Sequence, residues 1–176
     1  MTGELKKLLI EAYTDEHLGE SDKAYSYQVL FNPATFQRKY EIEYKEAQGQ
    51  GTSGTAQKFG YIKPQEFSFE FTFDGTGAAG LKIDVAKEIQ RFLETTGKMN
   101  GDIHRPLYLK ISWGSFLSKC VLKQADITYT LFKPDGYPLR AKVSATFLGT
   151  IEDVLRLAFE KAVLNPAKHV SVGTGA

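Results

Sequence analysis

Apolar and polar side chains alternate strictly in several parts of the chain, most clearly over residues 67–73. Four phenylalanines there alternate with Ser68, Glu70 and Thr72. A two-residue period places the two sets of side chains on opposite faces of a β-strand. Because a shift of one residue would expose all four phenylalanines, the pattern predicts a strand whose register is strongly fixed.

Similar alternation, or a run of residues that favour β-structure, predicts several further strands. We expect them at residues 8–13, 25–31, 38–45, 107–113, 127–131 and 139–147. The second of these ends at Asn32-Pro33, because proline cannot donate to a strand ladder. Gly114-Ser115 and Pro134-Asp135-Gly136 predict tight turns, so the last three strands follow one another in antiparallel order.

Helical spacing of apolar residues occurs at two places. The first covers residues 81–96, where Gly97 suits the end of a helix. Its apolar positions are Leu81, Val85, Ile89, Phe92 and Leu93. The second begins after Thr150, whose hydroxyl can cap a helix. Its apolar positions are Ile151, Val154, Leu155, Ala158 and Ala162.

Together these elements predict a mainly β fold with some α-helix. We expect an antiparallel β-barrel or sandwich, closed or nearly closed, with one central helix and one C-terminal helix. Residues 47–60 are rich in Gly, Ser, Thr and Gln, which predicts a long flexible loop. The predicted organisation is a β domain over residues 1–149, followed by a C-terminal helix and mobile tail over residues 150–176.

Composition narrows the classes of function. The 176 residues carry a net charge of +1, so neither nucleic-acid binding nor a polybasic membrane anchor is expected. No apolar run approaches the roughly 20 residues of a membrane span, and Glu11 interrupts the first apolar stretch too early for a signal peptide. The single cysteine, Cys120, allows no disulfide within the chain. We therefore expect a protein that is made and folded in the cytoplasm.

One segment imitates a nucleotide-binding motif. Residues 75–80 match G-x-G-x-x-G and lie between a predicted strand and a predicted helix. The preceding strand alternates, however, whereas a central parallel strand would be apolar throughout. No acidic residue follows the next strand to hold a ribose. We interpret these glycines as a tight strand-to-helix connection.

Other residues capable of chemistry are scattered. The histidines are His17, His104 and His169, and they share no metal-ligand spacing with one another or with Cys120. The carboxylates Asp74, Asp84, Asp102, Asp126 and Asp135 fit turns, caps and solvated faces better than an acid–base pair. We expect no catalytic, cofactor-binding or metal-binding residue, no cofactor and no enzymatic activity.

Four segments are specific when they occur together in this order. They are VLFNP at 29–33, FSFEFTFDGTG at 67–77, HRPLYLKISWG at 104–114 and ITYTLFKPDGYPL at 127–139. In combination they resemble the tube-type proteins of contractile injection systems, the phage-tail-like machines with which bacteria puncture cells. The resemblance spans most of residues 5–149.

The resemblance implies a tail-tube fold and a structural role. Six copies would form a ring whose strands join across subunits into a continuous inner barrel. Partners would be further copies, the inner tube protein, the spike-hub protein, and baseplate or sheath components, with no nucleic acid and no direct membrane insertion. Within the family, the chain resembles the tube initiator, an adaptor that joins the trimeric spike hub to the tube, but it lacks the C-terminal LysM-like module of many such adaptors. The particle would be type VI secretion-like, assembled in the bacterial cytoplasm and then released or membrane-anchored.

In such a ring, two sets of residues would face other molecules. Arg140, Lys142, Ser144 and Thr146 lie opposite the predicted core face of residues 139–147, so they form either an ordinary solvated face or a pore lining. The candidate subunit or ring contacts are Gly49, Gly51, Ser53 and Gly54 in the long loop, and Ile151, Val154 and Leu155 on the C-terminal helix.

Two other functions are compatible with the residues alone. The many aromatic side chains permit a monomeric β-barrel that binds a small apolar ligand. An enzyme that uses the glycine loop is the third possibility. Hexamer formation would indicate the ring protein. A melting temperature that rises with a ligand would indicate the barrel, and saturable nucleotide binding would indicate the enzyme.

Overall fold

The computed structural model of the chain describes residues 5–39, 41–46, 57–62, 65–101 and 105–153. Its main strands are β1 (Leu9–Tyr13), β2 (Lys23–Gln28), β3 (Thr35–Lys39), β6 (Gln65–Asp74), β9 (Tyr108–Trp113), β10 (Phe116–Phe132) and β11 (Pro138–Asp153). The smaller elements are η1 (Glu20–Asp22), β4 (Ile42–Glu46), β5 (Gln57–Ile62), α1 (Val85–Thr96), β7 (Met99–Asn100) and β8 (Arg105–Pro106).

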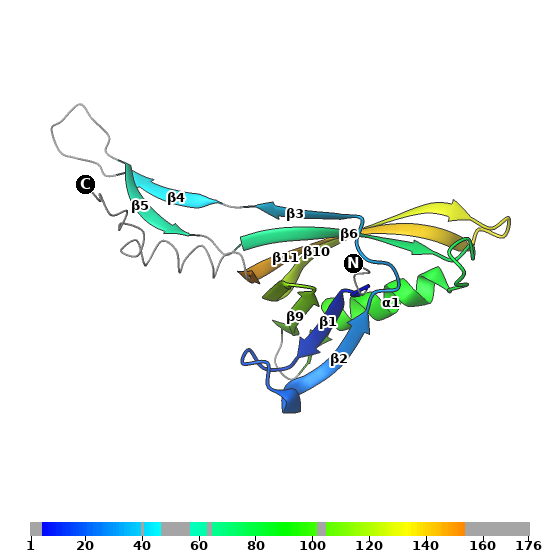
Figure 1. The fold of residues 1–176 in the computed structure, drawn as a ribbon, viewed down its shortest axis with the longest axis horizontal. Coiled ribbons are helices and arrows are strands. Elements are labelled where there is room, and N and C mark those ends of the chain that lie inside the picture. The colour runs from blue at the N-terminus through cyan, green and yellow to red at the C-terminus, as the bar shows by residue number, and fades with distance from the viewer. Residues whose placement is uncertain (1–4, 40, 47–56, 63–64, 102–104, 154–176) are drawn as a thin grey trace, which may run out of the picture.

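The main strands form one antiparallel sheet in the order β2-β1-β9-β10-β11-β6-β3 (Figure 1). The chain is therefore mainly β with a helix against the sheet, as the sequence predicts. The pairs β4–β5 and β7–β8 form separate two-stranded sheets. Figure 1 shows the β4–β5 hairpin extending past the end of β3, away from α1.

The core lies between α1 and one face of the sheet. The four phenylalanines of β6 are at most 4% exposed, which confirms the register that the alternation predicts. On the neighbouring strand β11, Ala141, Val143, Ala145 and Phe147 are fully buried opposite them. From α1, Phe92 packs on this layer, with its ring centroid 5.4 Å from that of Phe71. Small residues on β11 leave room for the large rings of β6.

The hairpin of β10 and β11 is much longer than an average strand pair. Its turn contains Pro134, Asp135 and Gly136, and Gly136 adopts a φ of 85°, as the predicted turn requires. Gly114, with a φ of 60°, turns the chain between β9 and β10. Both turns predicted from the sequence are therefore confirmed.

A buried carboxylate joins three strands of the sheet. Glu11 on β1 forms ion pairs with Lys23 of β2 at 2.7 Å and with Lys110 of β9 at 2.8 Å. Burial acts to raise the pKa of Glu11, but the hydrogen bonds from Lys110 and Lys23 outweigh it and lower the pKa. The carboxylate is therefore ionised and holds the two lysines against opposite sides of β1.

Two predicted strands differ from the structure in their extent. The second strand was expected at residues 25–31, but β2 is Lys23–Gln28, and the amide of Val29 instead donates to the carbonyl of Leu8. The alternation over residues 38–45 predicts one half-buried strand, but residues 38–39 belong to β3 and residues 42–45 to β4, which are in different sheets. In that pattern Tyr44 shares its face with Ile42 and would be buried, but it is 54% exposed. Alternation gives the face of a residue but cannot show that the chain leaves one sheet for another.

Three further boundaries are wrong in the prediction. Residues 57–60 belong to β5 rather than to the long loop, and residues 47–56 lie outside the described part. The helix begins at Val85 instead of residue 81, because Asp84 caps it by accepting a hydrogen bond from the amide of Lys87. Thr150 does not cap a helix, because residues 150–153 continue β11 and pair with β10. The rest of the predicted C-terminal helix and the predicted tail fall on residues 154–176, which lie outside the described residues.

The described strands of one copy form a curled, open sheet. Phe36 on β3 and Phe116 on β10 have ring centroids only 5.3 Å apart, although β6 and β11 lie between their strands. Three strand spacings of a flat sheet would span about 14 Å. The sheet therefore curls strongly, but within the described residues β2 and β3 each pair on one side only.

We expect Phe92→Ala to destabilise the fold by about 3–5 kcal/mol, because the substitution leaves a cavity between α1 and the sheet. The measurement is the free energy of unfolding in urea. Leu81→Ala is the matched control, since Leu81 is 48% exposed and its truncation should cost under about 0.5 kcal/mol. Equal effects of the two substitutions would contradict this account of the core.

Candidate functional site

Four neighbouring strands present a polar surface on the side of the sheet opposite α1. Directly paired residues share a face, so the registers of β3, β6, β11 and β10 define this surface. We call it the polar face. Its polar side chains are Thr35, Gln37, Lys39, Glu66, Ser68, Glu70, Thr72, Asp74, Gln124, Asp126, Thr128, Arg140, Lys142, Ser144 and Thr146. The same registers place the apolar Val121, Leu131, Phe132 and Leu148 on this side as well.

The structure brings together the four residues predicted to face a pore. Arg140, Lys142, Ser144 and Thr146 lie in one row along β11, on the polar face and opposite the buried row of the same strand. Of the other candidate contacts, Ile151 is the one that lies within the described residues. Ile151 lies in β11 opposite Ser118 of β10, whereas Gly49, Gly51, Ser53, Gly54, Val154 and Leu155 lie outside the described residues.

Ion pairs cross the polar face between strands. The carboxylate of Glu66 is 2.5 Å from the ammonium of Lys123, which lies at an irregularity in β10. The Glu70 carboxylate is 3.5 Å from the ammonium of Lys142. The hydrogen bond from Lys123 is the main cause that lowers the pKa of Glu66. Both of these acidic groups of β6 are thus close to a cation from another strand of the sheet.

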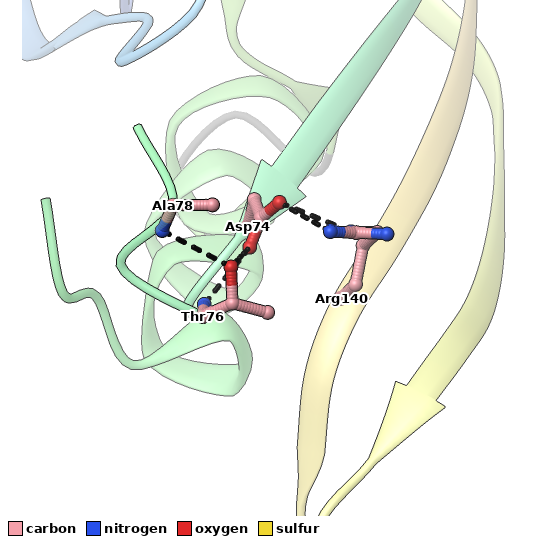
Figure 2. A network of polar contacts seen from close by, with 4 residues as sticks. All are labelled: Asp74, Thr76, Ala78 and Arg140. Carbon is pink, nitrogen blue, oxygen red and sulfur yellow. Dashed lines mark hydrogen bonds and ion pairs between the residues drawn. The ribbon is translucent and has the colours of Figure 1, made fainter. Parts of the chain in front are cut away.

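The third acidic group of β6 is the centre of a larger network (Figure 2). One oxygen of Asp74 accepts hydrogen bonds from the hydroxyl and the amide of Thr76, at 2.6 and 2.8 Å. Its other oxygen accepts two from the guanidinium of Arg140, at 3.0 and 2.8 Å. Figure 2 also shows the Thr76 hydroxyl accepting from the amide of Ala78. The network fixes the start of the glycine loop to β11.

The glycine loop does not have the geometry of a dinucleotide fingerprint. Four of its six amides already donate within the chain. Those of Thr76 and Ala78 belong to the network above, Gly75 donates to the carbonyl of Leu139, and Gly80 donates to that of Gly77. The helix begins at Val85, well after the last glycine, so its N-terminus does not open directly from the motif. Close approach explains Gly75, where a Cβ atom would be 2.5 Å from the carbonyl oxygen of Ile83. The interpretation as a strand-to-helix connection agrees with these contacts.

Two strands expose free backbone edges beside the polar face. Only residues 116–120 of β10 pair with β9, so residues 121–132 have β11 on one side and, within the described residues, no strand on the other. On the other side of the face, β3 pairs with β6 alone in that same part of the chain. Unpaired amides and carbonyls at such edges can accept a further strand.

An apolar groove of about 720 Å³ runs between α1 and the free edge of β10. Its large apolar lining residues are Ile89 and Leu93 of the helix and Leu122, Ile127 and Tyr129 of the strand. Polar and charged side chains also line it, namely Gln90, Glu94, Lys98, Lys123 and Gln124. Tyr129 is 42% exposed. The opposite edge of the sheet also exposes an apolar ring, since Phe36 on β3 is 42% exposed. Both edges therefore combine free backbone with uncovered apolar surface on the α1 side.

The residues that could carry other chemistry lie apart from one another. Burial raises the pKa of the Cys120 thiol to about 12, so this thiol is protonated at neutral pH. Among the described residues, no three His, Cys, Asp or Glu side chains gather as metal ligands would. The helix of the described part is too short and too polar to cross a membrane.

Sequence reasoning missed the acidic half of the polar face. Glu66, Glu70 and Asp74 recur every fourth residue, which on a strand places them on one side. That spacing was available in the sequence, but the cations that meet them come from β10 and β11. The groove could not be predicted from the sequence, because it forms only where α1 lies beside β10.

We expect Thr76→Val to raise the pKa of Asp74 more than Arg140→Gln does. The Thr76 hydroxyl is the largest cause that lowers this pKa, before the Thr76 amide and Arg140. A carboxyl whose folded pKa is depressed stabilises the fold above about pH 4, and that contribution is lost as the pH falls through its folded pKa. Carboxyl-carbon NMR titration of the two variants measures the shifts. A larger change in Arg140→Gln would mean that the ion pair dominates.

One family model matches the chain: residues 4–158 match the contractile injection system tube protein family. Among curated proteins, none matches the chain. The match covers the polar face, the groove and both free edges, and it agrees with the segments that resemble this family in the sequence. It supports a structural role in a contractile injection system, and the chain belongs to the contractile injection system tube protein family.

Proposed function

We propose that copies of this chain close into a six-membered ring by pairing β3 of one copy with the free edge of β10 in the next. The ring would surround a channel lined by the polar face, with α1 on the outside. The number six comes from the family resemblance. The observation that carries the proposal is the pair of free edges on the two sides of one polar face.

Strand direction supports this pairing. From β3 through β6 and β11 to β10, each strand is antiparallel to its neighbour, so β3 and β10 run in opposite directions. Copies related by rotation about a ring axis would therefore bring β3 antiparallel to the next β10. The free edge of β10 spans residues 121–132 and is long enough to accept all of β3, which is Thr35–Lys39.

The apolar surfaces at the two edges are complementary in position. Phe36 lies on the α1 side of β3, because it pairs opposite the buried Phe69. Joined edge to edge, Phe36 of one copy would face the groove between α1 and β10 of the next copy. Burial of a half-exposed phenylalanine stabilises such a contact by about 1–2 kcal/mol in addition to the backbone hydrogen bonds.

The polar side chains would continue across the same joint. Thr35 and Gln37 of β3 would lie beside Gln124 and Asp126 of the next copy, on the side opposite the core. A closed ring would then have a hydrophilic wall around its channel and a helix layer outside it. This is the division of surfaces that a water-filled tube requires.

The position of the ring in the particle would depend on the partners that it meets. We place it either among the stacked rings of the inner tube or, as an adaptor, between the trimeric spike hub and the tube. Inner tube protein, spike-hub protein and baseplate or sheath components would be its neighbours. Synthesis and assembly would occur in the bacterial cytoplasm, before the particle is released or membrane-anchored.

The packing of the core is less favourable to a barrel that binds an apolar ligand. The phenylalanines that might have lined a ligand cavity pack on one another, with the Phe67–Phe69 and Phe69–Phe71 ring centroids both 5.9 Å apart. If an apolar ligand raised the melting temperature of a stable monomer, that result would favour the ligand-binding barrel.

We expect Phe36→Glu to prevent ring formation and to leave the monomer folded but less stable, because Phe36 also packs on Phe69 and Phe116 of its own copy. The charge would have to enter the apolar groove of the next copy, which costs about 3 kcal/mol per joint, or roughly a hundredfold in the association constant. The matched control is Met99→Glu, because Met99 is 59% exposed and lies outside the proposed joint.

Mass photometry and negative-stain electron microscopy, with and without the spike hub, measure the outcome. The wild type and Met99→Glu should give particles of about six times the 19.6 kDa monomer with an open centre. Rings that appear only with the hub would favour the adaptor position. Monomers in every wild-type sample, or rings of Phe36→Glu, would contradict the proposal.

A further inference from the structure

The free edge of β10 is regular over only part of its length. Its ladder with β11 is irregular between Leu122 and Gln124, and again between Tyr129 and Leu131. Between these two places, residues 124–129 pair with β11 one by one, without a break. Because a bulge bends its strand and disrupts the ladder locally, an added strand can pair regularly only with the residues between two bulges. The usable part of the free edge is therefore the window of residues 124–129.

A lysine marks the first end of this window. Lys123 lies at the first irregularity, and its side chain is 45% exposed and paired with Glu66. Lysine side chains and bulges at sheet edges both oppose the pairing of further strands. The strand β3 itself ends in Arg38 and Lys39. A register that carried this end of β3 beyond Gln124 would set Lys39 against the bulge, where the ladder is broken and the charges are alike.

Length and face together leave one register for β3. The strand is five residues long and the window holds six, so an antiparallel β3 fits the window in two registers. The two differ by a slip of one residue, which exchanges the faces of all side chains. In one register the polar faces of the two copies are continuous. In the other, the polar face of one copy would join the α1 side of the next, so a ring with a single hydrophilic wall allows only the first.

We infer that β3 of one copy pairs with β10 of the next in a single register, which the two bulges of β10 set; this rests on the ring proposed above. The opposite pairs, with the β3 residue first, are Thr35 with Thr128, Phe36 with Ile127, Gln37 with Asp126, Arg38 with Ala125 and Lys39 with Gln124. Lys123 and Thr130, the residues left out of the ladder at the two irregularities, are the stops that limit β3 to this place.

The side chains that meet in this register are compatible on both sides of the sheet. Ile127 lines the groove and packs against the core, so it meets Phe36 within apolar surroundings. On the polar face, Asp126 is exposed, and its carboxylate accepts hydrogen bonds from Gln124 of the same strand at 2.9 and 2.8 Å. Lys39 would be the diagonal neighbour of Asp126, about 7–8 Å away, which a long side chain can span. The joint thus brings an apolar contact to one side and a cation beside a carboxylate to the other.

The register also gives the ring the stagger that a closed barrel needs. Within one copy, the pairings place Thr35, Glu70, Ser144 and Asp126 at one level across the sheet. At the joint, Thr35 lies opposite Thr128 instead, an offset of two residues or about 7 Å along the strand. Closure of a sheet into a barrel requires tilted strands and a staggered register. A joint with Thr35 opposite Asp126 would have no stagger at all.

The test is disulfide cross-linking between copies. The predicted pair is Gln37→Cys with Asp126→Cys, and the two matched controls combine Gln37→Cys with Gln124→Cys or with Thr128→Cys. All four positions are exposed and on the polar face, so each variant should fold. Opposite residues of an antiparallel pair have Cα atoms about 4.5–5.5 Å apart, which suits a disulfide. Residues two positions out of register are about 8 Å apart, beyond the roughly 7 Å that a disulfide can bridge.

Each variant is oxidised mildly with copper phenanthroline and run on a denaturing gel without reductant. We expect the pair at positions 37 and 126 to give a ladder of multiples of 19.6 kDa that reductant abolishes. Its cross-linking should exceed that of both controls by about tenfold or more, because only this pair meets the distance limit. Gln37→Cys alone is the control for bonds to the buried Cys120. Preferred cross-linking of either shifted pair, or equal cross-linking of all three, overturns the register.

Failure of the register and failure of the ring give different results. Mass photometry of the same variants under reducing conditions reports the ring without any cross-link. Rings that cross-link through a shifted pair contradict the register and leave the ring intact. Monomers that cross-link in none of the three variants contradict the ring itself, and the register with it.

Discussion

The two-residue period of β6 is the constraint on which the rest of the structure depends. Phenylalanine at every second position forces one side of this strand into a core, and the residues between them onto the opposite side. Since β11 pairs with β6 over ten positions, it must follow the same division. The core under α1 and the polar face are therefore two consequences of one register.

Small side chains on β11 make this register possible. Ala141 and Ala145 lie opposite Phe73 and Phe69, so a large ring on one strand meets a methyl group on the next. The rings then pack in T-shaped or tilted pairs against one another and against Phe92 of the helix. Close packing of this kind fixes the positions of the strands, and the ion pairs on the other side of the sheet depend on those positions.

The same arrangement explains why the candidate assembly surfaces lie at the edges. The two faces of the β10–β11–β6–β3 sheet are already committed, one to the core and one to internally paired charges. The surfaces that remain for assembly are the free backbone edges of β3 and of residues 121–132 of β10. Each edge has an exposed aromatic side chain beside it. Edges that are left free in one copy are an aggregation hazard unless a ring pairs every one of them. Closure would therefore supply solubility as well as shape.

Short-range patterns in the sequence determined much of the local structure of this protein. They determined the strand at β6, both tight turns, the helical face of α1 and the row from Arg140 to Thr146, because each depends on neighbours within one strand or turn. Tertiary structure alone decided where residues 38–45 leave the main sheet, why residues 150–153 extend β11, and which cations meet the acids of β6. These features depend on pairing between segments far apart in the chain, and alternation records the face of a residue but not the strand that will lie beside it.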